Sequence, residues 1–359
     1  MRNFGIDMDE LYYNIVDLLK RMISVPSVSR EESAVADLVS EFIESYGCHV
    51  HRSGNNIWCY SDNFSFDKPT ILLNSHIDTV KPVAGWTYPP FEATEVDDRI
   101  YGLGSNDAGA SLVCLLSVFL ALRSSSQSYN LVFLASCEEE VSGKAGVESV
   151  LPQLPPIAMA IVGEPTGMNP AVAEKGLMVL DGEIRGVSGH AARNEGTNAI
   201  YKAVEVVQTL KDLKFEKESE YLGPVKISVT QISAGTQHNV VPDLCKIVVD
   251  VRTTDAYSNE ETLEIIRKSV KDCDLFPRST RLRPSSIPMN NPIVQRLVFS
   301  GKEPFGSPTL SDQALMPFPS LKVGPGDSSR SHTADEYICQ SEIREAMQIY
   351  YTVLNGLRL

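Results

Sequence analysis

The amino-acid sequence predicts an α/β protein: a mixed, mainly parallel sheet with helices on both faces, plus an inserted α+β, ferredoxin-like domain. Two observations support this fold class. Short continuous apolar runs alternate with helical segments, which is typical of strands buried on both faces of a sheet. A later segment alternates polar and apolar residues instead, which is typical of a sheet with one exposed face.

The chain is expected to begin with two helices and a hairpin. Leu11 to Met22 repeats apolar residues at helical spacing. Ser29-Arg30-Glu31-Glu32 has the pattern of a capping box and predicts the start of the second helix, which Gly47 ends. Val50 to Tyr60 is typical of one or two strands around a Gly54-Asn55-Asn56 turn.

Four apolar runs predict the central sheet. They are Thr70–Asn74, Leu131–Ser136, Ala158–Gly163 and Phe318–Val323. The apolar segment from Ala108 to Arg123 predicts a helix between the first two runs. Polar residues follow each run at its carboxyl end, where open α/β sheets place their ligand sites. The pattern therefore predicts one site along this edge of the sheet.

The inserted domain is predicted over residues 170–285 in the order β-α-β-β-α-β. Its elements are a strand at Lys175–Arg185, a helix at Thr197–Leu213, strands at Val225–Ile232 and Lys246–Thr253, a helix at Ser258–Asp272 and a last strand at Arg281–Ile287. The second helix opens on another capping box, Ser258 with Glu261. The remaining residues, 1–169 and 286–359, are expected to form one discontinuous domain.

The composition excludes several partners. The chain has 359 residues, and 46 acidic against 32 basic residues give a net charge of −14. This balance argues against nucleic acid or an anionic membrane as the main partner. Seven scattered cysteines without a C-x-x-C pair indicate a reducing compartment. The N-terminus lacks the pattern of a signal peptide, and the apolar stretch Leu112–Leu122 is too short to span a bilayer. We therefore expect a soluble, cytoplasmic protein.

Polar residues at two strand ends suit a metal site. His76 precedes Asp78 by two residues, so one imidazole nitrogen can bind a metal while the carboxylate orients the ring. Asp107 ends the glycine-shaped loop 102–107 before a helix. At this point Asp107 is either a cap for that helix or a metal ligand.

A run of three glutamates further supports the hypothesis of a metal site. Glu138, Glu139 and Glu140 directly follow a buried strand, and their mutual repulsion is unfavourable unless cations or solvent intervene. One glutamate can bind metal while its neighbour stays free as a base. Glu164 follows the next apolar run, and His332 adds a second imidazole after the last one.

Nitrogen and oxygen ligands without thiolate suit Zn²⁺, with Co²⁺ or Mn²⁺ as possible substitutes. Two histidines and three carboxylates exceed what one catalytic zinc usually takes. Two Zn²⁺ ions that share a carboxylate therefore fit the set better.

An ordered set of motifs resembles a known family. The motifs are HIDTV (76–80), GLGSND (102–107), EEE (138–140), GEPT (163–166), SGHAAR (188–193) and GPGD…HTADEY (324–337). They resemble those of the co-catalytic zinc peptidases and amidohydrolases, which include acetylornithine deacetylase, succinyl-diaminopimelate desuccinylase, aminoacylase and glutamate carboxypeptidase. The resemblance extends over nearly the whole chain.

The resemblance implies a ligand for each metal position. His76 and Glu164 correspond to the terminal ligands of one zinc, and Glu139 and His332 to those of the other. Asp107 resembles the carboxylate that bridges the two ions.

It also implies roles beyond the ligands. Asp78 matches the aspartate that orients the histidine ligand, and Glu138 matches the general base. His190 resembles the histidine of the inserted domain that reaches the partner subunit's site, while Asn239 and Arg252 resemble substrate-binding positions. In this family the insert is a lid through which homodimers form.

The implied activity is hydrolysis of the amide bond of a small-molecule N-acyl amino acid by a water that two zinc ions activate. The motifs look most like those of acetylornithine deacetylase, which acts in arginine biosynthesis; N-succinyl-ornithine and N-acyl-citrulline are related substrates. A dipeptidase, a carboxypeptidase or succinyl-diaminopimelate desuccinylase is the alternative on the same scaffold. Two further readings are a Cys137 nucleophile beside a histidine and a non-catalytic metal-binding protein. Ala108-Gly109-Ala110 differs from many relatives, which have lysine two residues after the bridging aspartate.

Overall fold

The computed structural model describes residues 7–359 and divides into two compact units. The first unit comprises the residues up to Val172 together with Ser286–Phe305 and Ser311–Leu359. The second comprises Ala173–Ser285 and Gly306–Leu310, where the sequence suggested an insert over 170–285. Residues 1–6, part of the N-terminus without a signal-peptide pattern, lie outside the described residues.

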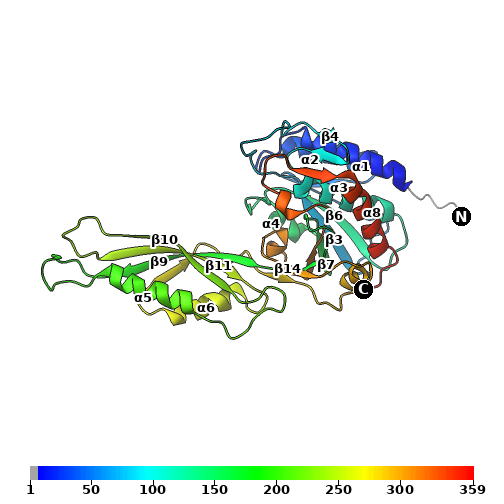
Figure 1. Ribbon diagram of the computed structural model, residues 1–359. Helices are drawn as coiled ribbons and strands as arrows, with labels where there is room; N and C mark the ends of the chain where they lie inside the picture. The colour runs from blue at the N-terminus through cyan, green and yellow to red at the C-terminus, as the bar shows by residue number, and fades with distance from the viewer. Residues whose placement is uncertain (1–6) are drawn as a thin grey trace. The chain divides into compact units, whose positions relative to one another are not determined.

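The first unit is built on a twisted central sheet (Figure 1). Its strands follow the order β1-β2-β6-β3-β7-β15-β8, with β1 at His51–Ser53, β2 at Asn56–Tyr60, β3 at Thr70–His76, β6 at Asn130–Ser136, β7 at Met159–Val162, β8 at Ala171–Glu174 and β15 at Ser320–Lys322. Strands β6, β3, β7 and β15 are parallel to one another. Strand β2 pairs antiparallel with β6, and β1 pairs antiparallel with β2. This arrangement confirms the predicted mixed, mainly parallel sheet.

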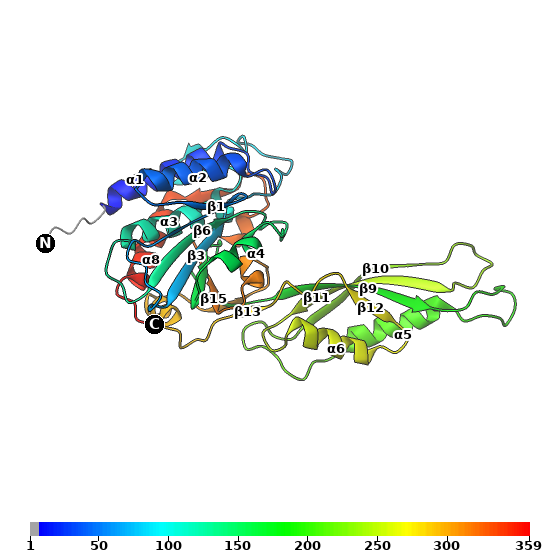
Figure 2. The ribbon, with the colours of Figure 1, turned by 180° about the vertical axis from the view of Figure 1, so that it is seen from behind.

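Helices cover both faces of this sheet (Figure 2). On one face, α3 (Ala110–Leu122) packs on β3 and β6, and α1 (Met8–Ile23) and α8 (Gln340–Leu354) pack on α3. The other face buries Leu72 and Val132 against the short helix α4 (Val147–Val150). The unit also contains α2 (Ser33–Ser45), α7 (Pro292–Phe299) and the 3₁₀ turns η2 (Leu151–Gln153), η3 (Asp312–Leu315) and η4 (Ser328–Arg330). Strand β14 (Phe305–Ser307) pairs with β8 and contains residues of both units.

One apolar segment combines the turn η1 (Ser105–Gly109), in which Asp107 and Ala108 are not helical, with α3. Ser105–Leu122 provides 18 residues with a mean hydropathy of 1.6, which is long and apolar enough to cross a membrane by length and composition alone. However, 89% of this segment is buried inside the protein. The core of the first unit therefore accounts for its apolar character.

A small second sheet joins two loops that are far apart in the sequence. It has the order β16-β5-β4, with β4 at Thr94–Val96, β5 at Arg99–Tyr101 and β16 at Tyr337–Cys339. Tyr337 pairs with Tyr101, so the loop that follows β5 meets the loop that precedes β16. These loops carry Asp107 and His332, respectively.

The second unit has a four-stranded antiparallel sheet in the order β10-β11-β9-β12. Its strands are β9 (Gly176–Arg185), β10 (Lys226–Ala234), β11 (Leu244–Thr253) and β12 (Asp274–Pro277), and its helices are α5 (Ala199–Asp212) and α6 (Asn259–Ser269). One face is buried by the helices, as the side-chain alternation of β9 predicts. The β-α-β-β-α-β order is as predicted.

Two local predictions were wrong. The last strand of the insert is β12, which pairs with β9, and the predicted stretch Arg281–Ile287 contributes only the two-residue β13 (Ser285–Ser286). Proline at 284 and 288 limits that stretch, because proline has no N–H for a ladder. The capping box at Ser29 does not form either: α2 starts at Ser33, and the Ser29 hydroxyl donates to Asp78. The Ser258 capping box is present.

Candidate metal centre

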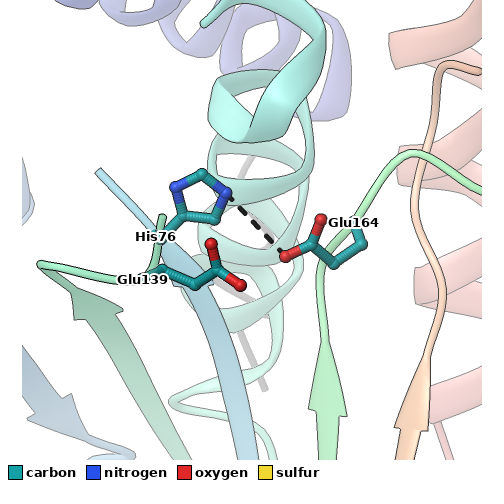
Figure 3. Close-up of side chains that lie close together, drawn as sticks. All are labelled: His76, Glu139 and Glu164. Atoms are coloured by element: carbon teal, nitrogen blue, oxygen red, sulfur yellow. Dashed lines mark ion pairs between the residues drawn. The ribbon is translucent and has the colours of Figure 1, made fainter. Parts of the chain in front are cut away.

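His76 is the last residue of β3 and is buried. Its Nδ1 lies 2.9 Å from the main-chain oxygen of Asp78, which fixes the ring orientation. Its Nε2 faces two carboxylates, at 3.3 Å from Oδ1 of Asp107 and 3.8 Å from Oε1 of Glu164 (Figure 3). Glu164 follows β7, the parallel neighbour of β3, so adjacent strand ends bring these side chains together.

Asp107 lies between the two histidines. One carboxylate oxygen, Oδ1, is 3.3 Å from Nε2 of His76, and the other, Oδ2, is 3.6 Å from Nε2 of His332. A carboxylate that offers a different oxygen to each side has the arrangement needed to bridge two cations. The alternative role as a helix cap does not apply, because the N-cap of α3 is Gly109 and no side chain caps this helix.

The glutamate that faces His332 is one position later in the acidic run than the sequence suggested. His332 faces Glu140, not Glu139: its Nε2 lies 3.0 Å from Oε2 and 3.2 Å from Oε1 of Glu140. Glu139 instead points toward His76 and Glu164, and the ligand atoms of these three residues all lie within 4.8 Å of one another (Figure 3). The pairing of Glu139 with His332 on one ion was therefore wrong.

Glu138 is turned away from this cluster. Its φ of 55° is in the left-handed region, and its carboxylate packs over Gly143, where an added Cβ would meet Oε2 at 1.8 Å. Among residues 7–359, the two groups of side chains close enough to share an ion both omit Glu138. The geometry does not support Glu138 as a base. Three consecutive glutamates give no sequence signal for this turn. Only the backbone direction after β6 shows which glutamate faces the histidines.

Asp78 connects the histidine to the acidic run. Its carboxylate accepts hydrogen bonds from the backbone N–H of Glu139 at 3.0 Å and of Glu140 at 3.2 Å, and from the Ser29 hydroxyl at 2.7 Å. Oδ1 of Asp78 also lies 3.6 Å from Nδ1 of His76. A single buried carboxylate thus positions three of the side chains in the centre.

The electrostatics show an excess of negative charge. Burial, together with the charge of Glu164, raises the pKa of Glu139 well above its usual value, although His76 opposes the shift. Burial and the nearby Asp107 likewise raise the pKa of Glu140. Despite the opposing effect of burial, the hydrogen bonds that the His76 ring donates to Asp107 and Asp78 raise its pKa well above its usual range. Carboxylates this close together need cations to balance them.

The donor set fits divalent cations. One group comprises His76, Glu139 and Glu164, and the other His76, Asp107 and Glu140, each with its ligand atoms within 4.8 Å of one another. All the donors are imidazole nitrogens or carboxylate oxygens, which suit zinc and related ions. Cys137 contributes nothing to the set. Burial raises the pKa of its thiol to about 12, and the thiol donates to the main-chain oxygen of Ala145, which argues against a thiolate nucleophile.

The remaining predicted site residues belong to the second unit. His190 is exposed, and its Nδ1 accepts a hydrogen bond from the backbone N–H of Ala192. The backbone N–H of Ala191 donates to the main-chain oxygen of Asn239, so Asn239 lies in the adjoining loop. Arg252 lies on β11 and forms a two-point ion pair with Asp250, at 2.9 and 3.2 Å.

Sequence reasoning missed the buried residues that hold the loops of the centre. Glu336 accepts hydrogen bonds from three backbone N–H groups of the Asp107 loop, and Asn106 connects that loop to the one that carries His332. Asp312 accepts a hydrogen bond from Ser136 at the end of β6, and burial raises its pKa to about 6. The motifs HTADEY, which contains Glu336, and GLGSND, which contains Asn106, could have drawn attention to two of them.

Histidine and carboxylate side chains that could hold metal ions, at the carboxyl edge of a mainly parallel sheet, are typical of a metal-dependent hydrolase. The chain belongs to the peptidase family M20/M25/M40, whose sequence pattern matches residues 72–356. Members of this family hydrolyse amide bonds, so the chain is a metallopeptidase-type amidohydrolase.

Relatives of similar length differ in their activity. The succinyl-diaminopimelate desuccinylase of Orientia tsutsugamushi (strain Boryong) is 25% identical over 381 residues and covers 95% of both chains. The acetylornithine deacetylase of Aliivibrio salmonicida (strain LFI1238) is 26% identical over 369 residues, covering 92% of this chain and 95% of the relative.

Solved structures share the fold. The aminopeptidase PepT of Bacillus cereus ATCC 10987 has a TM-score of 0.77 at 16% identity, covering 96% of this chain and 98% of that one. A Bacillus subtilis protein described as a dinuclear metal binding peptidase of the M20 family has a TM-score of 0.74 at 15% identity, covering 97% and 100%.

Proposed function

We propose that the protein hydrolyses the amide bond of N-acyl amino acids, with Glu139 as general base. The observation that carries this proposal is the division of labour within the acidic run. Glu140 faces His332 as a ligand would, whereas Glu139 points to the space beside His76 and Glu164. Family membership supports amide hydrolysis as the reaction class.

We assign two Zn²⁺ ions to the centre, with Co²⁺ or Mn²⁺ as possible substitutes. His76, Asp107 and Glu164 would hold one ion, and Asp107, Glu140 and His332 the other. When bound, such a pair supplies a water of lowered pKa and polarises the substrate carbonyl.

Glu139 moves the protons in this scheme. Its carboxylate lies beside His76 and Glu164, where it can take a proton from a water at the metal centre and then give it to the leaving amine. Asp78 holds the backbone of Glu139 and so sets the direction of its carboxylate. The products would be a free amino acid and a carboxylate.

The substrate class is a further part of the proposal. We favour N-acetyl-ornithine, with N-succinyl-ornithine and N-acyl-citrulline as related substrates, which would give the protein a role in arginine biosynthesis. Succinyl-diaminopimelate is a second candidate, because relatives with that activity resemble the chain equally well. His190, Asn239 and Arg252 of the second unit are the residues we assign to substrate binding and to stabilisation of the oxyanion.

We also propose a cytoplasmic homodimer that forms through the second unit. Its strand β10 is an edge strand, and apolar side chains stand exposed on α5 and β10. These side chains are Ile200, Tyr201, Val204 and Ile232. An unpaired edge beside exposed apolar side chains is typical of a surface that pairs with another chain.

The experiment that tests the function is a comparison of kcat/KM for N-acetyl-ornithine, N-succinyl-ornithine, N-acetyl-citrulline, succinyl-diaminopimelate and a dipeptide. The metal content is determined on the same sample. We expect chelator treatment to abolish turnover and Zn²⁺ or Co²⁺ to restore it. Full activity in metal-free protein, or no activity on any of these amides, would contradict the proposal.

A further inference from the structure

Two buried side chains outside the ligand set join the loops that carry Asp107 and His332. They are Asn106, which is fully buried, and Glu336, which is 2% exposed. Asp107 is contributed by the loop after β5, and His332 by the loop before β16. The two ligands are 225 positions apart in the chain (332 − 107 = 225), so something in the fold must fix the separation of their side chains.

Glu336 holds the Asp107 loop through backbone hydrogen bonds. Its Oε1 accepts hydrogen bonds from the backbone N–H of Asn106 and of Asp107, both at 2.9 Å, and its Oε2 accepts one from Gly104 at 3.2 Å. A carboxylate with three N–H donors from one loop fixes the path of that loop. The backbone of Glu336 takes part as well, because its carbonyl accepts from the N–H of Gly102 at 3.0 Å.

Asn106 connects the same loop to the other ligand. Its Oδ1 accepts from the backbone N–H of Asp327 at 3.0 Å, and its Nδ2 donates to the Asp327 carbonyl at 3.1 Å. Nδ2 also donates to the hydroxyl of Ser331, the residue before His332, at 3.3 Å. The approach is close enough that a Cβ on Gly326 would meet Oδ1 at 2.2 Å, and the φ of Gly326 is +86°. Glycine is therefore required at 326 for this contact.

We propose that Glu336 and Asn106 are positioning residues that hold Asp107 and His332 at bridging distance before any metal binds. This inference rests on the proposed two-metal function. The geometry supports it, because Oδ2 of Asp107 already lies 3.6 Å from Nε2 of His332 with these bonds in place. A preformed site does not have to order its loops when the ion arrives, so it binds the ion more tightly.

The two metal positions depend on this arrangement to different extents. His76 and Glu164 follow neighbouring strands of the central sheet, so strand pairing holds them in place. His332 lies on a loop and is about half exposed, and its distance to Asp107 depends on the joined loops. Loss of the positioning residues should therefore weaken the ion at the His332 position more than the ion at the His76 position.

The test is a calorimetric titration of chelator-treated protein with Zn²⁺, which gives separate dissociation constants for the first and second ion. We expect Glu336→Gln and Asn106→Asp each to weaken the second ion by about 10–100-fold, the range for partners of metal ligands. The first ion should weaken less. Glutamine keeps one acceptor but turns an NH₂ toward an N–H, and Asn106→Asp keeps the acceptor but loses both donors. With Co²⁺, the visible absorption of the second ion should also change.

Asp335→Asn is the matched control. Its carboxylate also accepts from backbone N–H groups, those of Thr87 and Tyr88, but it does not contact the Asp107 loop. A purely structural role for Glu336 would lower the melting temperature without changing the ratio of the two dissociation constants. Wild-type constants for both ions in Glu336→Gln and Asn106→Asp would overturn this inference and leave the proposed function intact. A wild-type protein that binds no ion would overturn the proposed function instead.

Discussion

Nε2 of His332 lies 3.0 Å from Oε2 of Glu140, and this contact sets the register of the whole acidic run. Once Glu140 faces His332, the residue before it, Glu139, faces His76 and Glu164, and Glu138 is left to pack over Gly143. The three consecutive glutamates therefore have three different environments, and each can be tested by the same substitution.

Glutamine at each of the three positions should give three different results. Glu139→Gln should lower kcat by about 10²–10⁴-fold, the usual contribution of a general base, while both metals stay bound. Glu140→Gln should release one of the two ions. Glu138→Gln is the control and should keep both ions and most of the turnover. Metal analysis and kcat for the three variants provide the check, and loss of turnover in Glu138→Gln with normal Glu139→Gln would reverse the assignment.

Removal of the Asp78 carboxylate should disturb several side chains at once. Asp78→Ala leaves the N–H groups of Glu139 and Glu140 without their acceptor and removes the carboxylate that lies 3.6 Å from Nδ1 of His76, so we expect about a 10–100-fold loss of metal affinity. Ser29→Ala is the comparison, because it removes only the hydroxyl bond to Asp78. That change should cost about 1 kcal/mol of stability, with nearly unchanged metal binding. Equal metal affinity in the two variants would argue against the role of Asp78.

The metal-free protein should become less stable as the pH rises from about 5 to 8. Burial raises the folded-state pKa of Glu139 and Glu140 above the usual 4.5, and hydrogen bonds raise that of His76 above 6.5 against the effect of burial. In each case the folded state binds protons more tightly than the unfolded chain. The stability they provide is present at low pH and is lost as the pH rises through the raised pKa values.

Zinc should remove most of this loss, because cations replace the protons. At a Zn²⁺ concentration about 100 times Kd the gain is about 2.7 kcal/mol for one site. Denaturant unfolding at several pH values, with and without Zn²⁺, measures both effects. A metal-free protein whose stability increases from pH 5 to 8 would show that the carboxylates do not repel one another as described.

Charge on the exposed face of α5 should separate the proposed dimer. Tyr201→Glu combined with Val204→Glu places two carboxylates among apolar side chains that we assign to the interface. We expect the molar mass from light scattering to fall from dimer to monomer, with the melting curve of the protein retained. Phe66→Glu, at an exposed aromatic residue of the first unit, is the control and should leave the mass unchanged. A monomeric wild type would contradict the proposal directly.

The elements that were predicted correctly have strong local signals. Apolar runs such as Leu131–Ser136 coincide with buried strands. A strand covered on both faces needs apolar side chains at nearly every position, so it is recognisable as a continuous apolar run. Ser258 with Glu261 marks a helix start correctly because both halves of the box lie within four residues. Local patterns of this kind need no knowledge of the rest of the fold.

The features that the sequence did not predict depend on contacts between distant segments. Ser29 has the sequence of a cap, but Asp78, 49 positions away, provides a better partner for its hydroxyl. The register of the acidic run depends on the left-handed turn at Glu138, which identical neighbours cannot reveal. Glu336 and Asn106 lie in quoted motifs, but their contacts between the two loops form only because β5 pairs with β16.

The position of His332 in the chain has a consequence for biosynthesis. A nascent chain that has passed Glu164 already contains His76, Asp107 and Glu140, yet residues 173–285 of the second unit must be translated before His332 emerges. Domains generally fold as units during synthesis. Until then the ribosome-bound polypeptide lacks one ligand of the position that we assign to Asp107, Glu140 and His332, so that position can be completed only late in maturation.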